Sequence, residues 1–384
     1  GDPLTPGQAA SGTPAALTPA ASPTLPSIPV VALAWGEARH LLSTLGGPAA
    51  PDAWMGALPL AYHLGPGGSA RVEVSMDDGL RPITNIVARV PGAVTPERVV
   101  MLGTHHDAWT FGGVDPGTGA AALLEVARVL GEMSRRGWRP ARTIALAFWD
   151  AEEYGLIGST EYAEDLRDEL RAQLVLYVNT DMYMRGRFDA GGVPSLRDFV
   201  VNVARDVPAM DVPRMAPAAT GTRASVLDGW RASDWARTPA SRRPPSPATF
   251  RPDLKPLGSG ADFVAFQDHL AIPTLSVEFI GANGYGFGTY HTNYDSRAYV
   301  ERVADPGFRQ GATMARVLGT LALRMAGADV VPFRFSHYAQ RLEEALGDVP
   351  AWRAAAGRRS VPVDVSPLIS AARRAGASAL RLER

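Results

Sequence analysis

The stretch 99-VVMLGTHHDAWTFGGVDPGTGAAALLEVARVL-130 contains a strand, a glycine-rich loop and a helix in succession. Residues 99–103 form a continuous apolar run, and from 117 onward apolar residues recur at helical spacing. The loop between them carries His105, Asp107 and Asp115. We predict a strand–loop–helix unit of an α/β fold, in which ligands bind at the carboxyl ends of the strands.

Three other stretches place similar side chains after apolar runs. They are 143-TIALAFWDAEEYGLIGSTEYAE-164, 174-LVLYVNTDM-182 and 289-TYHTNYDS-296. Imidazole nitrogens and carboxylate oxygens are the donors that zinc takes in proteins. Two metal ions about 4 Å apart can share a bridging carboxylate and a bridging water. The sequence therefore predicts a dizinc site whose ligands are His105, Asp115, Glu153, Asp181 and His291.

Each predicted ligand has a distinct role. We expect Asp115 to bridge the two ions, with His105 and Asp181 on one and Glu153 and His291 on the other. Glu152 directly precedes a ligand, so we expect it to act as the general base on the bridging water. The alternative for the adjacent pair of glutamates is a solvated acidic start to a helix.

The runs "GTHHDAWTFGGVDPGTGAA", "GWRPARTIALAFWDAEEYGLIGSTEYAE", "LGSGADF" and "YHTNYD" resemble glutamate carboxypeptidase II and the N-acetylated-alpha-linked acidic dipeptidase family. These are dizinc exopeptidases, and the transferrin receptor is a relative that lost the metals. The resemblance implies the same zinc ligands and the same base. It also implies that Asp107 orients His105 and that Tyr290 steadies the tetrahedral intermediate. Ser259 and Gly260 would lie near the scissile residue, although a helix cap is the structural alternative for this turn.

The alternation of apolar runs and helical stretches predicts an α/β sandwich. Strands are expected at 84–90, 98–104, 143–149, 174–180 and 274–279, and helices at 117–136, 158–171, 195–206, 260–270, 305–326, 337–346 and 366–382. The resemblance adds a three-layer zinc exopeptidase fold with a mixed, mainly parallel sheet of eight strands. The proline-rich stretch 208–255 is expected to be a long loop.

The resemblance also implies three domains. Residues 1–84 would be a remnant of an apical, protease-associated domain with a linker, 85–330 the dizinc peptidase domain, and 331–384 the start of a helical, dimerisation-type domain. The full-length protein is then expected to form a homodimer and to lie outside the cytoplasm, secreted or as a membrane-anchored ectodomain.

The segment "GDPLTPG" resembles a family segment that helps to bind a structural calcium ion. Calcium prefers oxygen donors, and the implied ligands are Thr5, Gln8, Glu161 and Glu164. The two glutamates are three residues apart and share one helix face. A solvated acidic face without a metal ion is the alternative.

Composition excludes several functions. The net charge of −1 does not favour binding to nucleic acid or to an acidic membrane surface. The absence of cysteine excludes disulfides and thiolate metal sites. No apolar run reaches the roughly 18 residues that a membrane span requires. The partner that the family resemblance implies is a peptide substrate.

One departure from the family concerns the substrate. Glutamate carboxypeptidases select acidic substrates with arginines, but Gly191, Ser276 and Glu278 stand near those positions here, and Ala261 replaces an asparagine. Glu278 would instead meet a free amino group of the substrate. The sequence therefore leaves open a carboxypeptidase, an aminopeptidase with the same metals, and a non-catalytic binding module of the transferrin-receptor type.

Overall fold

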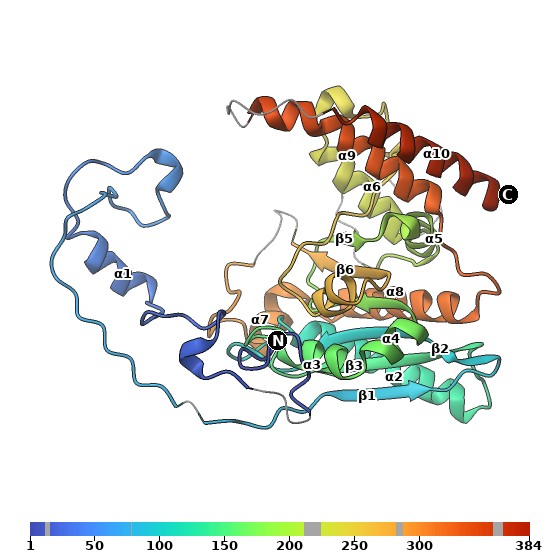
Figure 1. Cartoon of the computed structure of the whole chain (residues 1–384), viewed down its shortest axis with the longest axis horizontal. Coiled ribbons are helices and arrows are strands. Elements are labelled where there is room, and N and C mark those ends of the chain that lie inside the picture. Colours follow the sequence, from blue (N-terminus) through green and yellow to red (C-terminus); the bar gives the residue numbers. More distant parts are fainter. Residues whose placement is uncertain (12–15, 78, 211–223, 282–286, 356–363) are drawn as a thin grey trace. The chain divides into compact units, whose positions relative to one another are not determined.

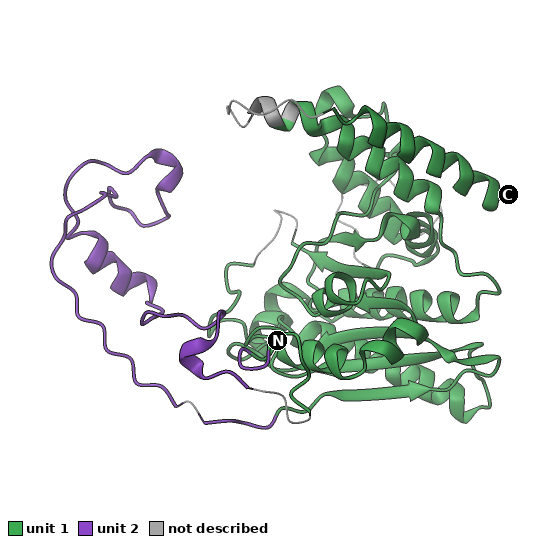
Figure 2. Ribbon diagram, viewed as in Figure 1, with its two compact units in different colours: residues 1–2, 6–14, 83–384 green, residues 3–5, 15–82 purple. Residues whose placement is uncertain are grey.

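The computed structural model describes residues 1–11, 16–77, 79–210, 224–281, 287–355 and 364–384. The chain divides into two compact units (Figure 2). The larger unit contains residues 1–2, 6–14 and 83–384, and the smaller contains 3–5 and 15–82. The helix α1, Trp35–Leu42, belongs to the smaller unit. The predicted zinc ligands and the predicted general base lie in the larger unit.

A six-stranded mixed sheet forms the centre of the larger unit (Figure 1). Its strands are β1 (Ile86–Val90), β2 (Thr95–His105), β3 (Arg142–Trp149), β4 (Leu174–Asn179), β5 (Arg187–Gly192) and β6 (Thr274–Ile280), in the order β1-β3-β2-β4-β6-β5. The four central strands are parallel to one another, whereas β1 and β5 run antiparallel at the two edges. The predicted mixed, mainly parallel α/β sheet is confirmed.

Both faces of the sheet are covered, because alternate residues of each central strand point to opposite sides. In β2, Val100 and Leu102 belong to one buried cluster, which includes residues of α2, α5, α6 and α8. Val99 and Met101 belong to a second cluster with residues of α3 and α4. A strand that is buried on both faces needs a continuous apolar run, which is the pattern seen in the sequence.

The α-helices of the larger unit include four that were predicted, at 117–136, 195–206, 305–326 and 366–382, with bounds that differ by at most four residues. The α-helices in the described part of this unit are α2 (Gly117–Arg135), α3 (Ile157–Asp165), α4 (Arg167–Gln173), α5 (Arg197–Asp206), α6 (Val226–Arg237), α7 (Arg297–Tyr299), α8 (Arg309–Gly327), α9 (Phe335–Ala355) and α10 (Ser366–Leu382), with π-helices at Ala265–His269 and Val300–Ala304. The last two α-helices pack against each other. No helix among the described residues is long and apolar enough to cross a membrane.

Several sequence predictions need correction. The described residues form six strands rather than eight, and β5 was not predicted. The expected loop at 208–255 contains α6, which begins at a capping box in which Ser225 and Asp228 bond each other's backbone amides. The helix expected at 260–270 is a short π-helix. The expected helix at 158–171 is divided in two at Leu166.

Candidate metal centre and substrate pocket

Three parallel strands deliver the site residues to one edge of the sheet. His105 is the last residue of β2 and pairs with Trp149, the last residue of β3. Glu152 and Glu153 follow β3, and Asp181 follows β4. Because carboxyl ends of neighbouring parallel strands meet at one edge, residues far apart in the sequence become neighbours.

Asp115 lies between two imidazoles. Its Oδ1 is 3.1 Å from Nε2 of His105, and its Oδ2 is 3.2 Å from Nε2 of His291. His291 Nε2 is also 3.0 Å from Oε2 of Glu153. Donor atoms of Asp115, Glu153 and His291 all lie within 4.8 Å of one another. One carboxylate thus presents an oxygen to each of two donor groups, as a bridging ligand must.

These separations fit zinc. Zinc–nitrogen and zinc–oxygen bonds of about 2.0–2.1 Å in a tetrahedron place ligand atoms about 3.3 Å apart. The distances from Asp115 to His105 and His291, 3.1 and 3.2 Å, and from His291 to Glu153, 3.0 Å, are close to that value. The donors are also of the type that zinc prefers, and those of His105 and Asp115 are buried. The residues present therefore fit the predicted metal.

Asp181 is held by a chain of hydrogen bonds that sequence reasoning missed. The Asn179 side-chain amide donates to Oδ1 of Asp181 at 3.0 Å. The Tyr177 hydroxyl donates to Oδ1 of Asn179 at 3.0 Å, and Nε1 of Trp149 donates to that hydroxyl at 2.9 Å. All four residues are buried, so the chain fixes the carboxylate. Polar residues within the apolar strand 174–179 were the sequence signal.

Asp107 connects His105 with the paired glutamates. Its carboxylate accepts hydrogen bonds from the backbone amides of Glu152 and Glu153, at 3.0 and 3.1 Å. Nδ1 of His105 lies 3.0 Å from the Asp107 carbonyl oxygen and 3.5 Å from its carboxylate. The orienting role implied by the resemblance thus has a geometric basis. Neighbouring His106 instead contacts the Thr84 carbonyl oxygen, at 3.0 Å.

The site holds an excess of negative charge. Burial raises the pKa of Glu152 to about 9 and that of Asp181 to about 6, and it raises the pKa of Glu153. Burial would lower the pKa of His105, but the carboxylates of Asp107 and Asp115 raise it to about 12. Clustered buried acids that hold a proton on a histidine form a site suited to a multivalent cation.

Backbone geometry at the site is unusual. His291 and Ala151, which precedes Glu152, have φ values of 54° and 55° in the left-handed region. Such strain in residues other than glycine is typical of functional sites. Asp295, also missed from the sequence although it lies in the "YHTNYD" run, accepts hydrogen bonds from the amides of Val114 and Asp115. It thereby ties the His291 loop to the backbone of the segment that carries Asp115.

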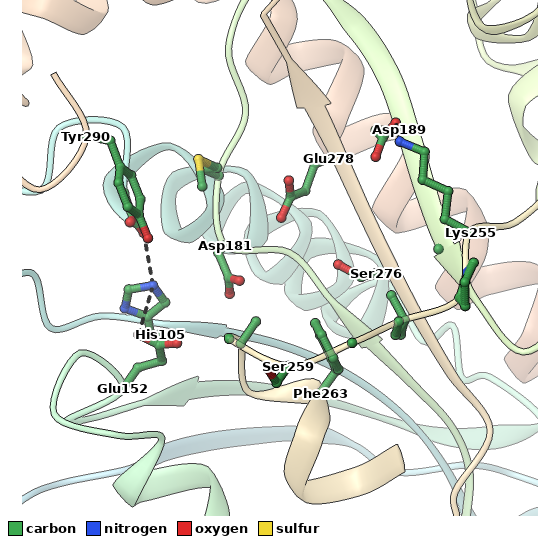
Figure 3. Close-up of a pocket in the computed structure, with 18 residues that line it drawn as sticks. His105, Glu152, Asp181, Asp189, Lys255, Ser259, Phe263, Ser276, Glu278 and Tyr290 are labelled. Atoms are coloured by element: carbon green, nitrogen blue, oxygen red, sulfur yellow. Dashed lines mark hydrogen bonds and ion pairs between the residues drawn. The ribbon is translucent and has the colours of Figure 1, made fainter. Parts of the chain in front are cut away.

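A cavity of about 440 Å³ opens beside the metal centre (Figure 3). One end is lined by His105, Asp115, Glu152 and Asp181. The residues predicted to contact substrate line the same cavity: Ser259, Gly260, Glu278 and Tyr290. So do Gly191, Ala261 and Ser276, which stand near positions where the family resemblance implies arginine or asparagine. The structure therefore brings together residues that are far apart in the sequence.

The predicted calcium ligands have a mixed outcome. Both carboxylate oxygens of Glu161 accept backbone hydrogen bonds, from Asp2 at 3.1 Å and Ala10 at 2.6 Å. Oε2 of Glu164 is buried without a hydrogen-bond partner among the described residues. Thr5 belongs to the smaller unit and Gln8 is exposed. Calcium binding stays a prediction.

An α/β sheet whose carboxyl edge carries these donors beside a substrate-sized cavity defines a metal-dependent hydrolase. The model of peptidase family M28 matches residues 85–306, and the chain belongs to this family. Membership confirms the predicted resemblance and the predicted class, a zinc metallopeptidase.

Two curated relatives agree with this assignment. Aminopeptidase NAALADL1 of Rattus norvegicus is 33% identical over 399 residues, covering 100% of the chain and 51% of the relative. The probable glutamate carboxypeptidase LAMP1 of Arabidopsis thaliana is 34% identical over 358 residues, covering 91% and 47%. The solved aminopeptidase from Aneurinibacillus sp. strain AM-1 has 19% identity and a TM-score of 0.43, covering 64% of this chain and 49% of that one. The chain thus spans about half the length of the curated relatives it matches.

Proposed function

We propose that this protein is a dizinc exopeptidase that hydrolyses a terminal peptide bond, with Glu152 as general base. The observation that carries the proposal is the position of Asp115, whose two oxygens face the imidazoles of His105 and His291. Glu153 and Asp181 complete the set of five ligands. When bound, two zinc ions would lower the pKa of a shared water and polarise the substrate carbonyl.

Glu152 is placed to move the proton. Its Oε2 lies 4.0 Å from Nε2 of His105, and the residue lines the cavity in which substrate would bind. Glu152 takes the proton of the attacking water and delivers it to the leaving amine. The pKa of Glu152, raised by burial, suits a group that must both accept and return a proton.

Tyr290 would stabilise the oxyanion of the tetrahedral intermediate. Its ring stacks on that of His291, with centroids 3.7 Å apart, and the residue lines the same cavity. The hydroxyl would donate a hydrogen bond to the oxygen that gains negative charge in the transition state. Trp109 also stacks on the ring of His291, with centroids 5.6 Å apart, which further restricts the imidazole.

The variant Glu152→Gln tests the mechanism. We expect it to lose activity by about 10²–10⁴-fold, the usual contribution of a general base, while it retains zinc. Peptide cleavage would be followed by mass spectrometry and bound zinc by atomic emission. Loss of zinc from this variant would contradict the role of base and indicate a ligand instead. A non-catalytic binding module, the alternative, would cleave no peptide even with zinc bound.

Other features of the whole protein are also proposed. Calcium binding is supported by the buried, unpartnered Oε2 of Glu164 in the described part of the chain. Homodimer formation and a location outside the cytoplasm follow from the family resemblance alone. Size-exclusion chromatography with light scattering would test the dimer.

A further inference from the structure

The cavity beside the metal centre continues to a second, charged end. That end is lined by Asp189 from β5, Glu278 and Ser276 from β6, and Lys255 from the segment that follows α6 (Figure 3). A cavity of about 440 Å³ has the size of a small-ligand site. It can therefore hold the end of a peptide whose scissile bond lies at the metals.

Two acids face each other at this end. Asp189 and Glu278 are directly paired in the antiparallel register of β5 and β6. Like charges in directly opposed positions of a sheet destabilise it. Such a pair is tolerated when cations neutralise it, so the partners of each acid decide what the cavity can bind.

Asp189 has its cations within the protein. Nη1 of Arg187 donates to Oδ1 of Asp189 at 2.6 Å, and the Lys255 ammonium group forms a second ion pair with the same oxygen. Arg187 and Asp189 are largely buried, which strengthens their attraction. Since Lys255 is already paired, it offers little attraction to an anionic substrate.

Glu278 has no such partner. The residue is 7% exposed and lines the cavity, yet no hydrogen bond or ion pair joins its carboxylate to another described residue. Burial raises its pKa well above the usual range, and the negative charges of Asp181 and Asp189 raise it further. A buried carboxyl without a partner is costly, and a cation supplied from outside relieves that cost.

We propose that Glu278 binds an ammonium group of the peptide substrate, which makes the cavity selective for substrates with a positive charge close to the scissile bond. The free α-amino group of a peptide is one source of this ammonium, and a lysine side chain is another. An acetylated acidic peptide would instead bring a carboxylate towards Glu278. The inference rests on the proposed function, because that function defines the ligand as a peptide.

Binding measurements separate this inference from turnover. The probes are Leu-Ala-Phe, acetyl-Leu-Ala-Phe and acetyl-Lys-Ala-Phe, titrated calorimetrically into the zinc-loaded Glu152→Gln variant. We expect a peptide with an ammonium group to bind about tenfold to a hundredfold more tightly than acetyl-Leu-Ala-Phe, as hydrogen bonds to charged groups permit. Tighter binding of Leu-Ala-Phe identifies the α-amino group as the ligand of Glu278. Tighter binding of acetyl-Lys-Ala-Phe identifies the lysine side chain. Equal binding of all three would overturn the proposal.

The second step adds Glu278→Gln to that variant. This substitution preserves shape and breaks no contact within the described protein, and thermal unfolding would verify the fold. The preference for an ammonium group should disappear, whereas the surface change Glu125→Gln should leave it intact. A preference that survives Glu278→Gln would refute the role of Glu278. Wild-type enzyme that binds selectively but cleaves no peptide would contradict the proposed function and leave this inference standing.

Discussion

The carboxylate of Asp107 accepts a hydrogen bond from the backbone amide of Glu152 at 3.0 Å, while the same residue contacts the ring of His105. One acid thus sets the position of both the proposed base, Glu152, and a proposed zinc ligand, His105. We predict that Asp107→Asn lowers zinc affinity by about 10–100-fold, the usual effect of losing the partner of a metal-bound imidazole. A competition titration with a zinc chelator would measure it. The exposed change Asp168→Asn should have no effect, and equal affinities in the two variants would contradict the prediction.

Asp115 is the residue that we propose to bridge the two metal ions. An asparagine at this position has a single side-chain oxygen and no charge, so it cannot bridge two ions as a carboxylate can. We predict that Asp115→Asn lowers zinc content from about two ions per chain to about one or fewer. Atomic emission on dialysed protein would check this. Retention of both ions would show that Asp115 does not bridge.

Breaking the hydrogen bonds that join Trp149, Tyr177 and Asn179 should lower the free energy of unfolding. Tyr177→Phe would leave Nε1 of Trp149 and Oδ1 of Asn179 unpartnered within the described core. Such losses cost about 1–3 kcal/mol each, so unfolding in urea should occur at lower concentration. Zinc affinity should also fall, because Asn179 no longer holds Asp181 as firmly.

Gly103 supplies a matched test of the same chain. A Cβ at this position would collide with the Tyr177 hydroxyl and lie 2.7 Å from Nε1 of Trp149. Gly103→Ala should therefore mimic Tyr177→Phe. The control Gly131→Ala, on α2, meets only the end of the Arg135 side chain at 3.8 Å and should lower neither stability nor zinc affinity. Unchanged zinc affinity in both Tyr177→Phe and Gly103→Ala would show that these hydrogen bonds do not position Asp181.

Without zinc, stability should depend strongly on pH. In the folded state the pKa is raised to about 9 for Glu152, about 8 for Asp262 and about 12 for His105. Between pH values of about 5 and 9 the folded chain therefore holds more protons than the unfolded chain, so the free energy of unfolding falls as pH rises. Thermal unfolding in a chelator at several pH values would measure the slope.

Two changes should reduce that slope. Asp262→Asn removes one of the raised acids and should flatten the dependence between about pH 4 and 8. Added zinc should counteract the loss of stability at high pH. Metal ligands must be deprotonated, so zinc binding strengthens as pH rises. A chelated protein whose stability increases from pH 5 to 9 would be inconsistent with these pKa shifts.

Much of the fold was accessible from the sequence. The runs at 99–103, 143–149 and 174–179 are apolar at every position or nearly so, since these strands are covered on both faces. Strand β5 was missed because its sequence, 187-RFDAGG-192, has neither a long apolar run nor clear alternation. Helix α6 was missed because prolines around it suggested a loop, although Ser225 and Asp228 carried a capping signal.

The sequence by itself determined the residue types of the site and their order at strand ends, because ligand chemistry and the parallel sheet restrict where such side chains can be used. Only the tertiary structure decided which of them meet. It placed His291 against Asp115, 176 residues away. It also gave Asp189 ion pairs with two cations and left Glu278 without an ion pair among the described residues, because pairing depends on strand register and on Lys255, which lies outside both strands. Charge compensation is set by distances in space, which no local pattern of residues specifies.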